Sequence, residues 1–219
     1  MTNSIFHRIA ELGVVPVIAI DDANRAIALA DALLEGGLPV AEITFRTKAA
    51  AEVIAIMAQE RPALITGAGT ILDTANLEAA RAAGARFGLA PGYDPRITAA
   101  AVDIGLPFAP GIMTPSELGA GLADGIRLFK FFPAKAAGDR ELLSAIHAPF
   151  AHLAPRFVPT GGITPDTMRD WLSLPAVAAV GGTWIATRED IASDNFAGIT
   201  RKAREAVALA AQIREENKK

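Results

Sequence analysis

The sequence of 219 residues contains no cysteine and no excess of positive charge. Without cysteine the chain has no disulfide, no thiolate nucleophile and no cysteine-based metal site, which is compatible with a reducing cytoplasm. The formal net charge of −3 and the isoelectric point near 5.7 provide no basic field for a nucleic acid. The composition therefore argues against thiol chemistry and against a polyanionic partner.

Histidine and long apolar runs are also scarce. The three histidines, His7, His147 and His152, lie in polar or proline-flanked surroundings without metal-ligand spacing, so we expect surface or capping roles and neither a metal nor a cofactor. No run of ~20 apolar residues occurs, and no basic N-terminal region precedes a long apolar stretch. We therefore expect a cytoplasmic protein that does not contact a membrane.

Short β-branched runs alternate with alanine-rich segments of helical spacing along the whole chain, which is typical of α/β proteins. No linker or change of composition interrupts this alternation, so residues 1–219 are predicted to form a single domain. The predicted strands are residues 14–20, 40–45, 63–66, 86–90, 107–109, 127–131, 156–159 and 176–180.

Helices are predicted between these strands and at both ends of the chain. A lead-in helix covers residues 4–12, a helix at 139–147 follows the sixth strand, and the last helix covers 196–213. Eight strands with helical crossovers in one domain favour a (β/α)8 TIM barrel over a doubly wound open sheet.

Lys130 interrupts an aromatic run on the sixth predicted strand, between Phe129 and Phe131. Burial disfavours the charged form of an amine and leaves free amine that can attack a carbonyl carbon to form a Schiff base. The alternative is a strand-edge lysine whose ammonium reaches solvent or pairs with a carboxylate. For a lone lysine beside phenylalanines the second interpretation is the more common one, because long cationic side chains usually keep their charged ends in water.

The barrel prediction gathers polar residues at one end, because TIM barrels build their sites from the carboxyl ends of the strands. Glu42 on the second strand and Lys130 on the sixth are predicted to point toward the barrel axis and to meet there. A buried ion pair without chemistry is the alternative to a catalytic pair. The other residues predicted at this end are Arg46, Thr70, Pro91, Thr160 and two glycine pairs.

The glycine pairs follow the seventh and eighth strands, where TIM barrels commonly bind phosphate. Gly161-Gly162 precedes a helix, and Gly181-Gly182 is followed by Thr183. Either pair alone is more often a tight turn than an anion site, but their shared position predicts a phosphorylated substrate. By contrast, the segment 67–70, Gly-Ala-Gly-Thr, does not continue as a dinucleotide fingerprint.

Five segments of this sequence, in this order, resemble those of the 2-keto-3-deoxy-6-phosphogluconate (KDPG) aldolases, which also act on 2-keto-4-hydroxyglutarate (KHG). The resemblance continues to the Gly-Gly-Thr-Trp segment at 181–184 and so covers nearly the whole chain. The five segments are Glu-Ile-Thr-Phe-Arg-Thr at 42–47, Gly-Ala-Gly-Thr at 67–70, Pro-Gly-Ile-Met-Thr-Pro-Ser-Glu at 110–117, Phe-Lys-Phe-Phe-Pro-Ala at 129–134 and Pro-Thr-Gly-Gly-Ile at 159–163.

This resemblance implies a class I aldolase that reversibly cleaves KDPG to pyruvate and glyceraldehyde 3-phosphate. It assigns the Schiff base to Lys130 and general acid/base catalysis to Glu42, and it implies a homotrimer. The other implied contacts are Arg46, Thr70 and Thr160 for the substrate carboxylate and keto group, Pro91 and Phe132 for the pocket, and Gly161, Gly162, Gly182 and Thr183 for phosphate.

Two local features distinguish the chain within this resemblance. Thr183 stands where close relatives carry serine, which keeps the hydroxyl and adds a methyl group. The related phosphogalactonate aldolases have an arginine at the end of the first strand, where this chain has Ile20, Asp21 and Asp22. The first difference bears on phosphate preference, and the second favours the gluconate-type substrate.

The same chemistry can be argued from the residue types. An iminium on Lys130 withdraws electrons from the bond between the third and fourth substrate carbons, and Glu42 can accept the hydroxyl proton of the fourth carbon. The iminium takes the place of a metal Lewis acid. Two other functions remain open at this point: a phosphosugar isomerase with Glu42 as base, and a phosphate-binding barrel without catalysis.

Overall fold

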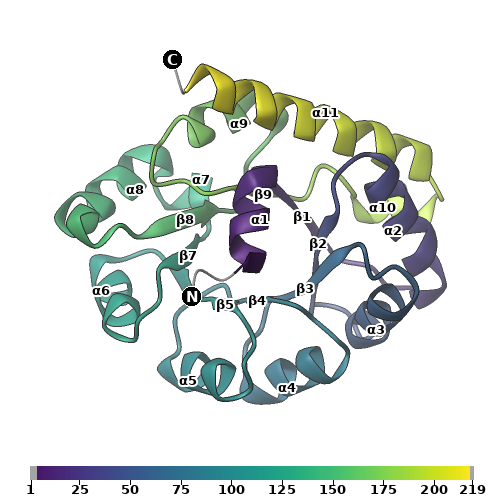
Figure 1. The fold of residues 1–219 in the computed structure, drawn as a ribbon, viewed down its shortest axis with the longest axis horizontal. Helices are drawn as coiled ribbons and strands as arrows, with labels where there is room; N and C mark the ends of the chain where they lie inside the picture. Colours follow the sequence, from purple (N-terminus) through teal and green to yellow (C-terminus); the bar gives the residue numbers. More distant parts are fainter. Residues whose placement is uncertain (1–3, 218–219) are drawn as a thin grey trace.

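In the computed structural model, which describes residues 4–217, helices surround a central set of parallel strands (Figure 1). The strands are β1 Val14–Ile18, β2 Val40–Thr44, β3 Ile65–Gly69, β4 Gly88–Leu89, β5 Phe108–Ala109, β6 Gly111–Ile112, β7 Leu128–Phe131, β8 Arg156–Pro159 and β9 Val180–Gly182. They form a six-stranded sheet of order β5-β4-β3-β2-β1-β9 and a three-stranded sheet of order β6-β7-β8. The predicted α/β class with a parallel, curled sheet is confirmed.

The predicted single eight-stranded sheet is replaced by these two sheets. Pro110, which has no N–H to donate, separates β5 from β6, so the chain pairs with β4 before the proline and with β7 after it. On the other side, two isolated bridges link the neighbourhoods of β8 and β9: Phe157 of β8 pairs with Val177, which precedes β9, and Thr160, which follows β8, pairs with Gly181 of β9. Each link between the two sheets is therefore short.

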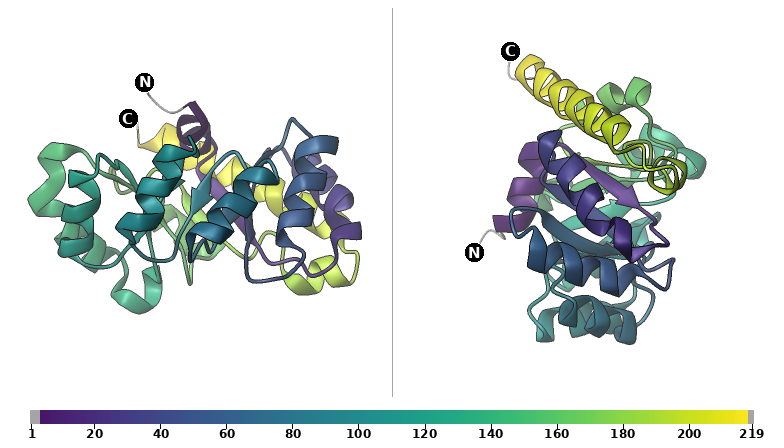
Figure 2. Two further views of the ribbon diagram at one scale, coloured as in Figure 1. Left: turned by 90° about the horizontal axis from the view of Figure 1, so that it is seen from below. Right: turned by 90° about the vertical axis from the view of Figure 1, so that its right-hand side faces the viewer.

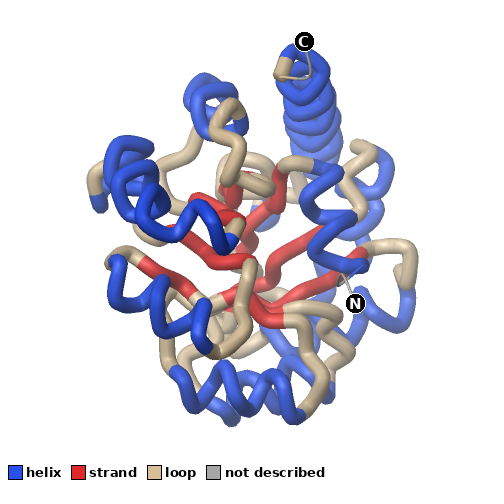
Figure 3. Tube along the Cα trace, turned by 60° about the vertical axis from the view of Figure 1, so that its left-hand side comes forward, coloured by secondary structure: helices blue, strands red, loops and turns tan. Residues whose placement is uncertain are grey.

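The helices lie outside the strands and cover them from all sides in Figures 1 and 3. None of the helices in residues 4–217 is long and apolar enough to cross a membrane. The predicted domain range 1–219 includes residues 1–3 and 218–219, which lie outside the described part. The helices are α1 Ser4–Leu12, α2 Ala26–Glu35, α3 Ala50–Glu60, α4 Thr74–Ala82, α5 Pro95–Asp103, α6 Pro115–Ala123, α7 Ala134–Ala137, α8 Asp139–His147, α9 Pro165–Leu172, α10 Arg188–Ala192 and α11 Phe196–Glu216, with 3-10 turns at Ala23–Arg25 and Ala148–Leu153.

The predicted lead-in helix, α1, covers the amino ends of the strands (Figure 2). Ile9 of α1 is buried, and the ring of Phe6 packs edge-on against Phe87 with centroids 6.3 Å apart. Phe6 and Leu128, the first residue of β7, line the same small cavity. One end of the strand assembly is thus closed by apolar packing, which leaves the carboxyl ends of the strands for a site.

The third and the last predicted strands are shifted along the chain because glycines continue the strands instead of ending them, whereas the other predicted strands differ from the structure by at most two residues at either end. The third strand was expected at 63–66 but is β3, Ile65–Gly69, and the last was expected at 176–180 but is β9, Val180–Gly182. A side chain on Gly67 would collide with the ring of Phe87, and one on Gly181 would collide with Thr160. These glycines are needed because neighbouring side chains approach the backbone closely.

Asp190 fixes the segment between β9 and α11 by three side-chain contacts. Its carboxylate accepts hydrogen bonds from Thr187 at 2.6 Å, Asn195 at 2.8 Å and Lys202 at 2.6 Å. Burial raises the pKa of Asp190, but the hydrogen bonds from Lys202, Thr187 and Asn195 outweigh this effect and lower the pKa to about 2. The ionised carboxylate therefore stabilises the folded state.

Replacement of Asp190 by asparagine is expected to lower the free energy of unfolding at pH 7 by about 2 kcal/mol. This is the stabilisation that the ionised carboxylate provides when its pKa falls from the ordinary value to about 2 on folding. Because the folded pKa lies below that of the unfolded chain, this contribution is present above about pH 4 and is lost as the pH falls toward about 2. Urea unfolding at pH 7 and pH 3 measures it. Asp103→Asn, at an exposed position, is the control and should change little; an equal loss in both variants would contradict the assignment.

Candidate active site

The site is organised around an ion pair between a strand of the six-stranded sheet and a strand of the three-stranded sheet. Lys130 lies on β7 and Glu42 on β2, and the lysine Nζ donates a hydrogen bond of 2.9 Å to Glu42 Oε1. The two residues are only 5% and 1% exposed. The structure thus brings together the two side chains that strand alternation predicted to meet, although 88 residues separate them.

The surroundings of this pair hold an amine and a carboxylate away from bulk water. The ring centroid of Phe132 lies 5.8 Å from Lys130 Nζ, within the range of a cation–π contact. On the opposite side, Glu42 borders a cavity of about 10 Å³ lined by apolar residues of α1 and the strands. A nucleophilic amine beside a carboxylate that can accept and return a proton is the minimum set for Schiff-base chemistry.

Glycine at position 69 makes the room that the Glu42 carboxylate occupies. A Cβ atom at Gly69 would lie 2.1 Å from Glu42 Oε1, a distance that real atoms do not adopt. Gly69 pairs with Thr44 in the β2–β3 ladder, so the contact is fixed by strand register. The short Gly-Ala-Gly run of β3 therefore positions the carboxylate.

The substitution Gly69→Ala is expected to displace Glu42 from Lys130. Turnover should fall on the order of 10- to 100-fold, the usual effect of misplacing a reacting group by about 1 Å, and the free energy of unfolding should fall by about 1–3 kcal/mol because of overpacking. Steady-state kinetics and urea unfolding measure the two effects. Gly119→Ala on α6 is the matched control, because its Cβ would make only ordinary contacts, the nearest at 3.6 Å from Phe150; normal turnover in Gly69→Ala would contradict the positioning role.

Thr70 and Pro91 lie at the carboxyl ends of β3 and β4. Thr70 directly follows Gly69 and has a positive φ of 58°, an uncommon conformation for a β-branched residue that is often found at functional sites. The backbone of Pro91 lies against Gly111, which pairs with Lys130 in the β6–β7 ladder. Both residues therefore lie just beyond the ends of strands that belong to the same parallel sheet as β2.

Thr160, Gly161 and Gly162 follow β8. Thr160 is 4% exposed and donates a hydrogen bond of 3.3 Å to the Val158 carbonyl. Gly161 and Gly162 have φ angles of 99° and 80°, and Gly161 lies against the ring of Phe132. The structure thus joins the first glycine pair to the aromatic residue beside Lys130.

Gly182 and Thr183 end β9 on the other side of the site. Gly182 is needed for packing, because a Cβ there would overlap the ring of Trp184. Thr183 is exposed and lines a cavity of about 250 Å³ together with Arg46, which follows β2. These two residues, far apart in sequence, face the same space.

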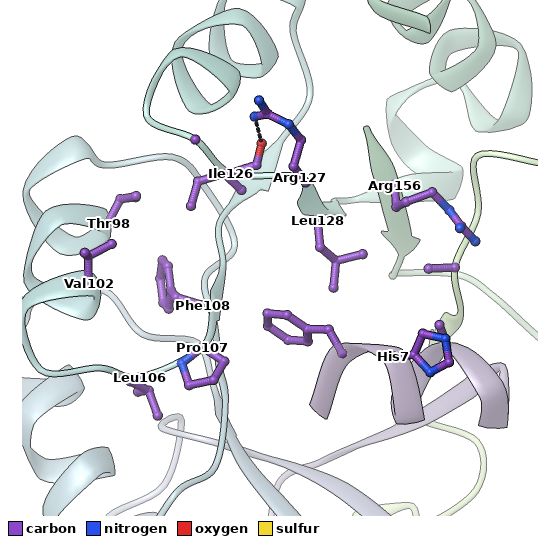
Figure 4. Close-up of a pocket in the computed structure, with 14 residues that line it drawn as sticks. His7, Thr98, Val102, Leu106, Pro107, Phe108, Ile126, Arg127, Leu128 and Arg156 are labelled. Atoms are coloured by element: carbon purple, nitrogen blue, oxygen red, sulfur yellow. Dashed lines mark hydrogen bonds between the residues drawn. The ribbon is translucent and has the colours of Figure 1, made fainter. Parts of the chain in front are cut away.

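A larger cavity of about 520 Å³ lies at the opposite end of the molecule, beside α1 (Figure 4). Phe108, Leu128 and Arg156 line it near the starts of their strands, and His7 reaches it from α1. Neither Lys130 nor Glu42 borders this cavity. Size therefore does not identify the candidate site, which is marked by the Lys130–Glu42 pair.

Several residues at the site were not predicted from the sequence. Gly69 creates space for Glu42, and Lys135 packs against Gly162 with its backbone N–H bonded to the Gly161 carbonyl at 3.0 Å. Arg188 lines the cavity that contains Arg46 and Thr183. The position of Gly69 inside a short run of small residues could have indicated a close approach of a side chain to the backbone. No local pattern in the sequence distinguishes Arg188 from other arginines.

The family model described as KDPG and KHG aldolase matches residues 5–202 of this chain. The KHG/KDPG aldolase of Escherichia coli (strain K12) is 42% identical over 194 residues, which cover 89% of this chain and 90% of that protein. The 2-dehydro-3-deoxy-phosphogluconate aldolase of Dickeya dadantii is 45% identical over 195 residues, with coverage of 89% and 91%.

A solved structure with the same fold is the KDPG aldolase of Legionella pneumophila, in which pyruvate was captured as a covalent carbinolamine intermediate. It superimposes with a TM-score of 0.87 at 37% identity and covers 93% of this chain and 97% of that one. The carbinolamine is the adduct that precedes a Schiff base, and it requires an amine nucleophile.

Proposed function

The chain belongs to the KDPG and KHG aldolase family and is an aldehyde-lyase, and we propose that Lys130 is its Schiff-base nucleophile and Glu42 its general acid/base. The protein is a class I aldolase that cleaves KDPG to pyruvate and glyceraldehyde 3-phosphate. The 2.9 Å contact between a buried lysine and a buried glutamate carries the residue assignment. Incubation with pyruvate and borohydride, followed by peptide mapping, tests it, since the reduced adduct must lie on Lys130.

In the proposed reaction, the Lys130 amine adds to the second substrate carbon, and the resulting carbinolamine loses water to form an iminium. Glu42 then removes the proton of the fourth-carbon hydroxyl, and the bond between the third and fourth carbons breaks, with its electron pair moving into an enamine. Glyceraldehyde 3-phosphate leaves, Glu42 returns the proton to the third carbon, and water releases pyruvate. The carboxylate ends each cycle in the state in which it began.

Around this pair, we assign the substrate's carboxylate and keto end to Arg46, Thr70 and Thr160. Arg46 forms no ion pair with any residue from 4 to 217, so its guanidinium is free to bind a carboxylate at two points. Pro91 and Phe132 line the pocket. These assignments are supported by the position of each residue within two residues of the end of its strand.

Phosphate is assigned to Gly161, Gly162, Gly182 and Thr183. The positive φ angles of the first pair turn the backbone after β8, and Thr183 adds a hydroxyl from the end of β9. We expect inorganic phosphate or sulfate to inhibit competitively against KDPG. Kinetics with increasing phosphate at constant ionic strength measure this, and the absence of competition would contradict the assignment.

We further propose that the two sheets form one (β/α)8 barrel in a single domain, that the protein assembles as a homotrimer and that it acts in the cytoplasm. The bridge between Thr160 and Gly181 and the continuity through Pro110 support the barrel. Leu72, Met113 and Phe132 follow strands β3, β6 and β7 and are 60%, 42% and 36% exposed, which supports an interface at this rim. Light scattering at micromolar concentration tests the trimer, and a monomer would contradict it.

A further inference from the structure

The cavity of about 250 Å³ between Arg46 and Thr183 is lined by a second arginine, Arg188. Arg46 follows β2, Thr183 follows β9 and Arg188 is the first residue of α10, so three elements contribute to one space. The remaining lining side chains are threonines and small apolar residues, and none is acidic. Two guanidinium groups on one cavity without a carboxylate in its lining favour an anionic ligand.

In the structure Arg188 is held by one exposed carboxylate outside the cavity lining. Its Nη2 donates a hydrogen bond of 3.0 Å to Asp21 Oδ1, and the two side chains are 54% and 67% exposed. An exposed ion pair of this kind contributes little to stability and is readily exchanged. The guanidinium can therefore turn to a stronger acceptor, such as a phosphate group, without disturbing the fold.

The backbone that carries Arg188 is fixed, in contrast to its side chain. Thr187, immediately before it, caps α10 through reciprocal hydrogen bonds with Asp190. Asp190 is anchored in turn by Lys202 of α11. A fixed Cα with a long, mobile, cationic side chain is suited to follow a charged group into the cavity.

We propose that Arg188 binds the phosphate group of the substrate and sets a preference for phosphorylated over unphosphorylated 2-keto acids. This inference rests on the proposed aldolase function. A substrate with a carboxylate at one end and a phosphate at the other matches two arginines on one cavity, since Arg46 takes the carboxylate. Arg188 is then a specificity-determining residue that acts with Thr183, while Asp21 competes for the same guanidinium.

The decisive experiment compares Arg188→Met on KDPG and on KHG, which carries no phosphate. We expect kcat/KM for KDPG to fall about tenfold or more, mainly through KM, because a charge-assisted contact to phosphate is lost. The value for KHG should change less than about threefold, within the effect of an exposed ion pair. Asp21→Asn should have the opposite effect on KDPG binding and lower the KM for KDPG, because the substitution removes a negative charge that competes with phosphate for Arg188.

The matched control is Arg25→Met. Arg25 also pairs with exposed aspartates, Asp22 and Asp194, but it does not line the cavity, so its kinetic constants should remain those of the unaltered protein. Equal losses on both substrates in Arg188→Met, or an unchanged KM for KDPG, would overturn the inference.

Calorimetric titration with inorganic phosphate separates this inference from the aldolase assignment. Phosphate affinity should weaken in Arg188→Met and strengthen in Asp21→Asn, whether or not Lys130 forms a Schiff base. Pyruvate trapping by borohydride should be unchanged in both variants, because it involves neither residue. Identical phosphate titrations of the unaltered protein and Arg188→Met would exclude Arg188 as a phosphate ligand.

Discussion

Replacement of Lys130 by methionine is expected to abolish both borohydride trapping with pyruvate and cleavage of KDPG. Imine formation needs an amine at this position, and methionine keeps the length and the apolar stem of the side chain without the nucleophile. Mass spectrometry of the trapped protein and a coupled assay for pyruvate release measure the two effects. Trapping at another residue with cleavage intact would overturn the assignment.

The same variant needs a stability control because the partner of Lys130 is buried. Glu42 is 1% exposed, so removing the lysine leaves an uncompensated carboxylate, which costs about 3–5 kcal/mol in typical buried pairs. The double variant Lys130→Met/Glu42→Gln removes both charges and is expected to recover most of this loss. A double variant that is folded and stable but inactive separates loss of chemistry from loss of structure.

Replacement of Glu42 by glutamine is expected to lower turnover by on the order of 10² to 10⁴, the usual range for a positioned general base. Glutamine occupies nearly the same volume beside Gly69 but does not accept the hydroxyl proton. Trapping with pyruvate should persist, although more slowly, because Lys130 is retained. Single-turnover cleavage of KDPG compared with the rate of trapping measures the difference between the two steps.

Two controls accompany the Glu42 variant. Glu52→Gln, at an exposed position on α3, should leave turnover unchanged. A chelator should affect neither variant nor the unaltered protein, because the iminium supplies the electrophile for the proposed reaction. Turnover of Glu42→Gln within about threefold of the unaltered protein would exclude Glu42 as general base, since that loss is far below the range for such a group.

Elements with a strong local signal were predicted to the residue. The lead-in helix at 4–12, the helix at 139–147 and the strand at 156–159 have the expected bounds. The meeting of Lys130 and Glu42 was also predictable, because strand alternation and parallel order determine which side chains face the axis. The spacing of apolar residues was therefore enough to predict these elements and the side chains that face the axis.

The bounds of β3 and β9 were predicted wrongly for one reason: glycine occurs both in turns and at crowded positions within strands. In a sequence, glycine marks a turn, but in β3 and β9 it lies within the strand because Glu42, Phe87, Thr160 and Trp184 need the space of a missing side chain. Those partners lie on other strands or in the following loop, so no local pattern identifies them. Arg188 was missed for a similar reason, since its contact with Asp21 spans 167 residues.

The position of α1 has a practical consequence for attaching the protein to a surface. Both described ends of the chain lie on the same side (Figure 2), where Arg214 near the end of α11 donates hydrogen bonds to the carbonyls of Glu11 and Ala178. α1 lies beside the starts of the strands, whereas the candidate site is at their carboxyl ends. A tether at either terminus, for immobilisation on a resin or an electrode, should therefore leave the substrate entrance open to solution.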